Sequence, residues 1–532
     1  MKHQRFPSRR SPVLARHGMV ATSQPLAAMA GLRVLIDGGN AADAAVTTAA
    51  MLNVVEPMST GVGGDCFALI YDASTGQVTA LNGSGRAPEA FTLEQAEQIG
   101  LREVPLTGAL SVTVPGTVSG WAALLERFGS MSLGECLGPA ISTAEEGFPV
   151  TERISAGWRE AEQKLSGEPE AARIYLPVPR PGELHRQPDL ARTLRTIAEG
   201  GCEAFYHGPL ATMIAACVQE RGGYLTTGDL AAHNATWETL IWTKYRGVEV
   251  LEHPPNSQGL AALLALNIVE AHDLGGMDYF DADRWHWMIE AMRLGMVDAG
   301  RYVADPAMTD VPVSVLLSKE YAAARRSLIV ANKALPLAAP GQPEHQDTVY
   351  LSVVDSQGNA VSFINSLYHG FGSGLVVPGT GICLQNRGAC FVLEEGHPNA
   401  LAGGKRPYHT IIPAMALRDG SLWLSFGVMG GFMQPQGHMQ VLSNLVDHGL
   451  DAQAALDAPR FRVDERGGLQ VSIETGVPAE TYQALEAMGH RVLLQPAFWS
   501  GFGGGQIIAV RADTGVLEGG SDPRKDGCAV GF

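Results

Sequence analysis

The chain of 532 residues lacks the features that mark several classes of protein. Its seven cysteines show no CxxC spacing, which argues against a disulfide framework and against a zinc knuckle. No apolar run reaches the length that crosses a bilayer, and the basic N-terminus has no apolar segment typical of a secretory signal. We therefore expect a soluble, cytoplasmic protein with reduced thiols, without a membrane partner. The cysteines are Cys66, Cys136, Cys202, Cys217, Cys383, Cys390 and Cys528.

Positive charge is also scarce, with 38 Lys and Arg against 55 Asp and Glu, for a formal net charge of −17. Such a chain is poorly suited to neutralising phosphates, so we expect no nucleic-acid partner. The glycine run at Gly61–Gly64 lacks the GK[ST] ending of a phosphate loop, and His345, His369 and His438 are widely dispersed. We expect neither a cofactor nor a metal ion.

What the sequence does contain indicates a layered α/β fold. The alanine-rich stretch from Gly18 to Val55 predicts two closely packed helices. The apolar runs Cys66–Tyr71 and Val78–Leu81, joined by a turn, predict a β-hairpin. Helical periodicity dominates from 110 to 345, as in Trp121–Arg127, Leu190–Ile197 and Leu260–Glu270.

The proline-rich, polar stretch Leu335–Asp347 predicts an exposed loop and the clearest internal boundary. Two apolar, β-branched runs follow it, Thr348–Val354 and Ala360–Ile364, with a strong turn signal between them. Further strands are expected at Leu422–Gly427 and Gln506–Val510, and helices at Met439–Asp447 and Ala452–Ala458. We expect residues 1–347 and 348–532 to be the two chains of one processed unit.

The junction between Asp347 and Thr348 carries the predicted chemistry. A threonine hydroxyl is a weak nucleophile that needs a base. If the chain is cut before Thr348, the freed α-amine, with a pKa of about 8, becomes that base. A threonine at the start of a strand is usually only a β-branched residue of a sheet, so the surrounding motifs must decide.

Those motifs resemble the γ-glutamyltranspeptidase family of N-terminal-nucleophile hydrolases over nearly the whole chain. In chain order they are GGNAADAAV (38–46), EPMSTGVGGD (56–65), VPGTVSGW (114–121), PAISTAEEGFPV (139–150), YRGVEV (245–250), TVYLSVVDSQGNAVSFINS (348–366), FGSG (371–374), KRPYHTIIP (405–413), MGG (429–431), APRF (458–461) and SDPR (521–524).

The resemblance implies a four-layer αββα sandwich in which a large and a small chain stay together as a heterodimer after autocatalytic cleavage. It also implies that Thr348 is the catalytic nucleophile. Ser366 stands where the family usually has a threonine that bonds the nucleophile's amine. Gly430 and Gly431 match the pair whose N–H groups form the oxyanion hole, where a missing Cβ lets the backbone approach the substrate.

The departures from the family pattern lie in substrate binding. Arg86 is displaced towards the Ala-Pro pair, and Tyr368 replaces an Asn or Glu. The Gln and Asp that hold the glutamyl amino group fall on Arg387 and Cys390. The serine pair that holds the carboxylate falls on His409 and Thr410. A cation has been gained and an acid lost, so we predict a small anionic amide bound by Arg86, Arg387 and His409.

Among branches of the family, this pattern favours the oxamate amidohydrolases of purine-ring breakdown, which convert oxamate to oxalate and ammonia. Three alternatives remain: a γ-glutamyl hydrolase or transpeptidase, a glutaryl or cephalosporin acylase, and an inactive scaffold. Each pocket residue also has a purely structural interpretation. Arg86 could satisfy loop carbonyls, Arg387 could sit in an ion pair, and His409 and Tyr368 could belong to the core.

Overall fold

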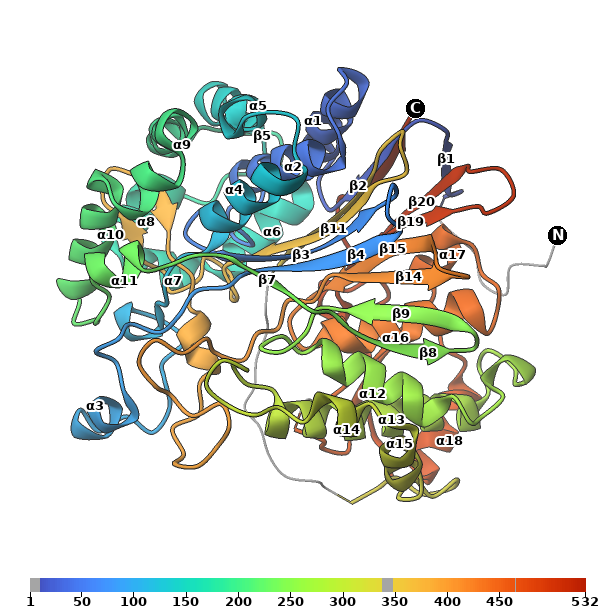
Figure 1. Ribbon diagram of the computed structural model, residues 1–532. Coiled ribbons are helices and arrows are strands. Elements are labelled where there is room, and N and C mark those ends of the chain that lie inside the picture. The colour runs from blue at the N-terminus through green and yellow to red at the C-terminus, as the bar shows by residue number, and fades with distance from the viewer. Residues whose placement is uncertain (1–9, 337–347, 465) are drawn as a thin grey trace.

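The computed structural model describes residues 10–336, 348–464 and 466–532. Two seven-stranded sheets lie face to face, with helices over each outer surface (Figure 1). The α1, α2, α4 and α5 helices cover one sheet, and α12, α13 and α16 cover the other. The expected four-layer αββα sandwich is confirmed.

The first sheet has the strand order β21-β2-β10-β11-β3-β4-β7. All of its neighbouring strands are antiparallel. The strands are β2 (Met19–Thr22), β3 (Asp65–Asp72), β4 (Gln77–Gly83), β7 (Thr236–Glu238), β10 (Val349–Val354), β11 (Ala360–Ser366) and β21 (Cys528–Gly531).

The second sheet has the order β1-β20-β19-β15-β14-β9-β8. Its strands are β1 (Val13–Ala15), β8 (Ile241–Tyr245), β9 (Val248–Glu252), β14 (Ala414–Arg418), β15 (Ser421–Met429), β19 (Gly504–Val510) and β20 (Leu517–Ser521). Each sheet contains strands from before and from after the 348 boundary, so neither segment contains a complete sheet.

The helices over the first sheet pack closely because their contacts are small. In α1 (Pro25–Ile36), a Cβ on Gly31 would come within 2.1 Å of the Thr48 hydroxyl of α2 (Ala41–Val55). A capping box begins α2, in which Asn40 and Asp43 each bond the other's backbone N–H. The same layer contains α4 (Thr117–Phe128), α5 (Leu133–Glu146) and α9 (Pro188–Tyr206).

Over the second sheet lie α12 (Gly259–Val269), α13 (Ala282–Tyr302), α16 (Met433–Val446) and α17 (Ala452–Asp457). Helix α12 is buried along its whole length, as expected of a helix that is apolar on every side.

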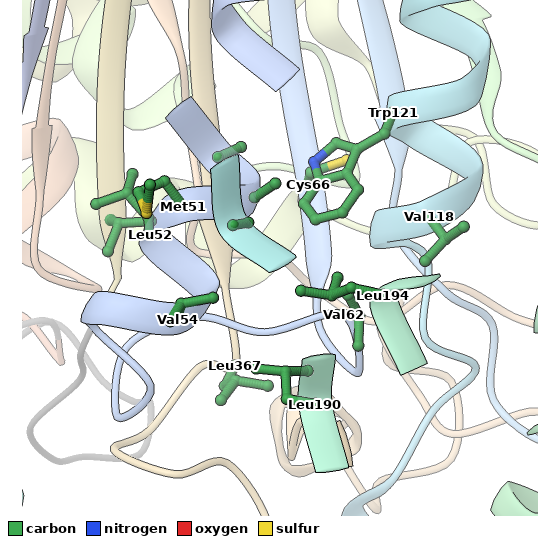
Figure 2. Packing of buried hydrophobic residues seen from close by; sticks show 14 of the residues in the cluster. Met51, Leu52, Val54, Val62, Cys66, Val118, Trp121, Leu190, Leu194 and Leu367 are labelled. Atoms are coloured by element: carbon green, nitrogen blue, oxygen red, sulfur yellow. The ribbon is translucent and has the colours of Figure 1, made fainter. Parts of the chain in front are cut away.

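Apolar side chains fill each of the three interfaces between the layers. Figure 2 shows part of the cluster between the first sheet and its helices, where Trp121 of α4 stands beside Cys66 of β3. Leu367, the residue after Ser366, lies close to Leu190 of α9 in the same view. The end of β11 is thus anchored in the core.

The predicted hairpins at 66–81 and 348–364, the paired N-terminal helices and the strands near 422 and 506 are confirmed. The expectation of a mainly helical stretch from 110 to 345 is wrong for 236–252, which forms β7, β8 and β9. Helix α16 begins at Met433, six residues before the expected start. Most of the loop predicted at Leu335–Asp347 lies outside the described residues. Among the residues the model covers, no helix is long and apolar enough to cross a membrane.

Candidate active site

Thr348 lies directly before β10, at the end of the first sheet, and its side chain is fully buried. The antiparallel register pairs Val349 with Asn365, which brings Thr348 opposite Ser366. Their hydroxyl oxygens are 3.1 Å apart. The structure therefore brings together the predicted nucleophile and its predicted hydroxyl partner. Asp347, the other half of the predicted cleavage site, lies outside the described residues.

An apolar cluster forms the floor beneath this site. Its members are Phe67, Tyr350, Ile364, Ile411 and Met429, all at most 2% exposed. Side chains two residues apart on a strand point to the same face of a sheet. On the strands β3, β10 and β11, the polar residues two positions beyond this floor are Asp65, Thr348 and Ser366. Sheet geometry therefore explains why these three gather at one edge.

Gly430 and Gly431 link the end of β15 to the start of α16. Their φ angles are 125° and 58°, in the left-handed region where a side chain would be strained. A Cβ on Gly430 would also come within 3.0 Å of the Gly503 backbone. Met429 of the floor immediately precedes this pair, which places it at the same end of the sheets as Thr348. Backbone N–H groups just before a helix favour negative charge, as an oxyanion hole requires.

Arg387 brings an unusual buried charge to the site. Its guanidinium donates to the Thr410 hydroxyl at 2.8 Å and to the Ser366 hydroxyl at 3.4 Å, and it lies 4.2 Å from the centre of the Tyr368 ring. The side chain is fully buried, and its Nε has no hydrogen-bond partner. Among the described residues, no carboxylate lies within salt-bridge distance of it. A buried cation without a carboxylate in contact is costly, so this arrangement suits an anionic ligand.

Tyr368 and Cys390 complete the surroundings of Arg387. Tyr368 adopts a φ of 81°, and its backbone N–H donates to the Ser366 hydroxyl at 2.8 Å. Burial raises the pKa of the Cys390 thiol, and the Arg387 charge only partly opposes that effect. Cys390 is therefore held as a neutral thiol beside the guanidinium.

His409 is fully buried and pairs with Asp65, their Nε2 and Oδ2 atoms being 3.2 Å apart. Burial holds the pKa of His409 well below its usual value, and the Arg387 charge adds to the effect. The ring is therefore neutral near pH 7. Its Nδ1 accepts from the Ile411 N–H at 3.4 Å, which leaves the proton on Nε2 to be donated to Asp65.

Arg86 has a different environment from the one predicted. Its guanidinium donates to Asp305 at 3.2 Å and to the Gly404 carbonyl at 3.1 Å, and 34% of its side chain is exposed. The described contacts join Arg86 to these groups and not to Thr348, Ser366 or Arg387. Its role in substrate binding stays a prediction, tested below.

Two residues of the site, Gln258 and Asp65, were not predicted from the sequence. Gln258 donates to the Thr410 carbonyl at 2.6 Å and to the Gly431 carbonyl at 2.8 Å, so it ties the predicted pocket to the predicted oxyanion hole. Asp65 holds His409. A buried glutamine at the start of α12 carries no local pattern, but an acid directly before the apolar run 66–71 is a signal that could have been followed.

His286, Glu290 and His490 form the one group in the described residues with ligand atoms close enough to share a metal ion, all within 4.8 Å of one another. However, the Arg293 guanidinium donates to the Glu290 carboxylate at 2.5 Å, and the His286 ring bonds both His490 and the Val330 carbonyl. These contacts already engage Glu290 and both ring nitrogens of His286, and a cation would face the Arg293 charge. The group is better explained as a structural network.

A threonine at the start of a strand, a hydroxyl partner beside it and a glycine pair at a helix start, all within an αββα sandwich, define an N-terminal-nucleophile hydrolase. The family model of gamma-glutamyltranspeptidase matches residues 27–532. The chain belongs to the gamma-glutamyltranspeptidase family, and the expectation of an enzyme of this hydrolase class is confirmed.

Three relatives illustrate the range within the family. The chain is 38% identical to the glutathione hydrolase-like YwrD proenzyme of Bacillus subtilis, over 98% of this chain and 99% of the relative. It is 36% identical to the oxamate amidohydrolase proenzyme of Klebsiella pneumoniae, with the same shares. The crystal structure of cephalosporin acylase from Bacillus halodurans is 47% identical, with a TM-score of 0.92 over 100% of this chain and 99% of that one.

Proposed function

We propose that the chain is a precursor that cuts itself before Thr348 and then hydrolyses a small anionic amide, with oxamate as the first candidate. The products would be oxalate and ammonia. The relatives described as proenzymes support the cut, and the buried Arg387, which no described carboxylate contacts, supports the anionic substrate.

In the proposed mechanism, the Thr348 hydroxyl attacks the amide carbonyl while its own freed α-amine accepts the hydroxyl proton. The N–H groups of Gly430 and Gly431 stabilise the oxyanion that forms. The protonated amine then donates its proton to the departing ammonia, which leaves an ester on Thr348. Water, deprotonated by the same amine, hydrolyses this ester and regenerates the enzyme.

The position of Arg387 favours a substrate with a short acyl group. A single hydroxyl, that of Ser366, bridges the guanidinium and the nucleophile, at 3.4 Å from one and 3.1 Å from the other. In oxamate the carboxylate is bonded directly to the carbonyl under attack, so both groups must be bound close together. A carboxylate at the end of a longer chain would need a cation farther from Thr348.

A glutaryl or cephalosporin acylase is the second candidate, favoured by the 47% identity to the Bacillus halodurans structure. A glutaryl group is also anionic and lacks the α-ammonium of a glutamyl group. Both candidates agree with the charge of Arg387, although its position next to Ser366 favours the shorter acyl group. A γ-glutamyl ammonium would be repelled by that charge.

The cut is tested by intact-mass measurement of purified wild-type protein and of Thr348→Ala and Thr348→Ser variants. We expect wild type and Thr348→Ser to yield chains of 347 and 185 residues, because both keep a hydroxyl nucleophile. Thr348→Ala should remain one chain of 532 residues without activity. A Thr348→Ala protein that still divides at this position would overturn the proposal.

The substrate is tested by measuring kcat/KM of the mature enzyme for oxamate, glutaryl p-nitroanilide and γ-glutamyl p-nitroanilide. Ammonia release reports on the first and nitroaniline release on the other two. We expect oxamate to be preferred and the γ-glutamyl compound to be poorest. A preference for glutaryl p-nitroanilide selects the second candidate, and a preference for the γ-glutamyl compound refutes the anionic site.

A further inference from the structure

Asp65 is a buried acid that the mechanism above does not use. It is the first residue of β3, and the strand register pairs it with Ser366, which itself lies opposite Thr348. Thr348, Ser366 and Asp65 therefore form one row across three neighbouring strands. The Asp65 side chain is fully buried, and its carboxylate accepts from the Gly85 N–H at 2.9 Å and from His409 at 3.2 Å.

The negative charge of Asp65 acts on Arg387. Arg387 bonds Ser366, the strand neighbour of Asp65, and it is the strongest of the charges that favour the ionised form of this acid. The two groups are not in salt-bridge contact. Before an anion binds, Asp65 can therefore act as the counter-charge of Arg387 without contacting the guanidinium.

Of the titratable side chains around Asp65, Asp65 itself is the one expected to change its charge near neutral pH. Arg406 is a second cation that favours the ionised acid. The neighbouring histidines are held neutral by burial, which lowers the pKa of His253 to about 3 and that of His409 well below its usual value. Burial raises the pKa of the remaining neighbours, so they stay protonated: Cys66, Cys390 and Tyr206.

We infer, building on the proposed anionic substrate, that Asp65 is a positioning residue that balances Arg387 in the empty site and takes up one proton from solvent when a substrate carboxylate binds. Two carboxylates near one buried cation repel each other, so the arriving anion favours protonation of the other acid. The only bond formed is the O–H bond of Asp65. Substrate binding and proton uptake are thereby coupled.

The pH range in which binding takes up a proton follows from the pKa of Asp65 before the anion binds. Burial raises the pKa of the Asp65 carboxyl to about 7, against the lowering effect of Arg387. Below about pH 6 the acid already carries its proton, and binding of the anion requires no uptake. Above pH 7 the acid is ionised, so the dissociation constant of the anion should rise by up to about tenfold per pH unit, as expected for linkage to one proton.

The test is calorimetric titration of mature enzyme with oxalate at pH 6 and pH 8, each in two buffers of different ionisation enthalpy. The α-amine of Thr348 also titrates in this range, so wild type is compared with Asp65→Asn, which keeps the amine and lacks the acid. We expect wild type to take up more protons on binding than Asp65→Asn, by nearly one proton per oxalate at pH 8 and by almost none at pH 6. Equal proton counts in the two proteins at pH 8 would overturn the inference.

Glu252 provides a matched control. It is a second buried acid paired with a histidine, its Oε1 lying 2.7 Å from the Nδ1 of His438, and burial raises its pKa as well. It is not among the groups that act on Asp65. A Glu252→Gln variant should take up as many protons per oxalate as wild type. If its proton uptake fell as far as that of Asp65→Asn, a specific role for Asp65 would be refuted.

A second measurement covers the case in which Asp65→Asn does not mature. Infrared difference spectra of wild type with and without oxalate at pH 8 should show a new band of a protonated carboxylic acid, which oxalate itself does not give at that pH. Absence of this band overturns the inference. If oxalate does not bind at all, the anionic site of the proposed function fails together with it, whereas binding without uptake refutes only the inference.

Discussion

Two fully buried arginines in this protein have opposite surroundings. Arg524 bonds Glu474 at 2.9 Å, Asp522 at 3.0 Å and two backbone carbonyls, so its charge is compensated within the fold. Arg387 bonds two neutral hydroxyls and has no carboxylate in contact among the described residues. A buried cation with its own anions stabilises structure, whereas one without them is available to a ligand. Matched substitutions separate these roles.

The largest expected effect on stability is that of Arg524→Met. The variant would leave Glu474 without its guanidinium partner and weaken the network in which Arg460 bonds Asp522 at 2.7 Å. Removing one member of a buried ion pair typically costs about 3–5 kcal/mol. We expect a clearly lower melting temperature and reduced soluble yield. A variant that melts with wild type would show that this cluster is not what stabilises the region.

Arg387→Met should show the reverse pattern. Because no described carboxylate contacts Arg387, and Asp65 can be neutralised by a proton once the guanidinium is gone, Arg387→Met should lower the melting temperature far less than Arg524→Met. Loss of a buried charged contact to substrate costs about 2–5 kcal/mol, so kcat/KM for oxamate should fall by about 30- to 5,000-fold. Steady-state kinetics and thermal melting of the same preparation provide both readouts. A large loss of stability with normal kinetics would make Arg387 structural, like Arg524.

The sequence predicts more of the fold than of the contacts within the site. The hairpin from Thr348 to Ile364 was predictable because its turn signal and its alternating strands are local in sequence. Strands β8 and β9 were missed because they are five residues each and one of their partners, β14, lies more than 160 residues away. No local pattern encodes that pairing.

In the site, the resemblance indicated Thr348, Ser366, Arg387 and Thr410, and the structure places these side chains in hydrogen-bond contact. The partners of Arg86 and the burial of Asp65 depend on chain segments brought together only by folding. Asp305, which binds Arg86, is 219 positions away from it. Such contacts cannot be read from composition or spacing.

Ser366 lies between the ligand-free cation and the nucleophile, and its replacement should have an intermediate effect. Ser366→Ala removes the acceptor of the Tyr368 N–H and a contact to Thr348, at about 1–3 kcal/mol for a buried polar group left without a partner. We expect both the rate of chain cleavage and kcat to fall by about 10- to 100-fold. Ser366→Thr should restore both, because it keeps the hydroxyl; failure of this rescue would argue against a role of the hydroxyl itself.

The smallest effect is expected for Arg86→Ala, which tests the remaining predicted cation. Its side chain is partly exposed and its partner Asp305 also accepts from the Arg406 N–H at 2.9 Å. Loss of such a pair costs about 1 kcal/mol or less, so kcat/KM for oxamate should stay within about fivefold of wild type. An increase in KM beyond tenfold, with kcat and melting temperature unchanged, would instead place Arg86 at the substrate carboxylate, as the sequence suggested.

Because each sheet combines strands from both sides of Thr348, the proposed cut has a consequence for the stability of the mature protein. On the proposed cut, β2 stays wedged between β21 and β10, and β3 stays bonded to β11, although no peptide links them any longer. These strand pairings would hold the two chains together after the cut, whereas the uncut precursor folds as one continuous chain. We therefore expect unfolding of the cut protein to be hard to reverse, because its two chains are no longer linked. Its lifetime would then be set by its rate of unfolding.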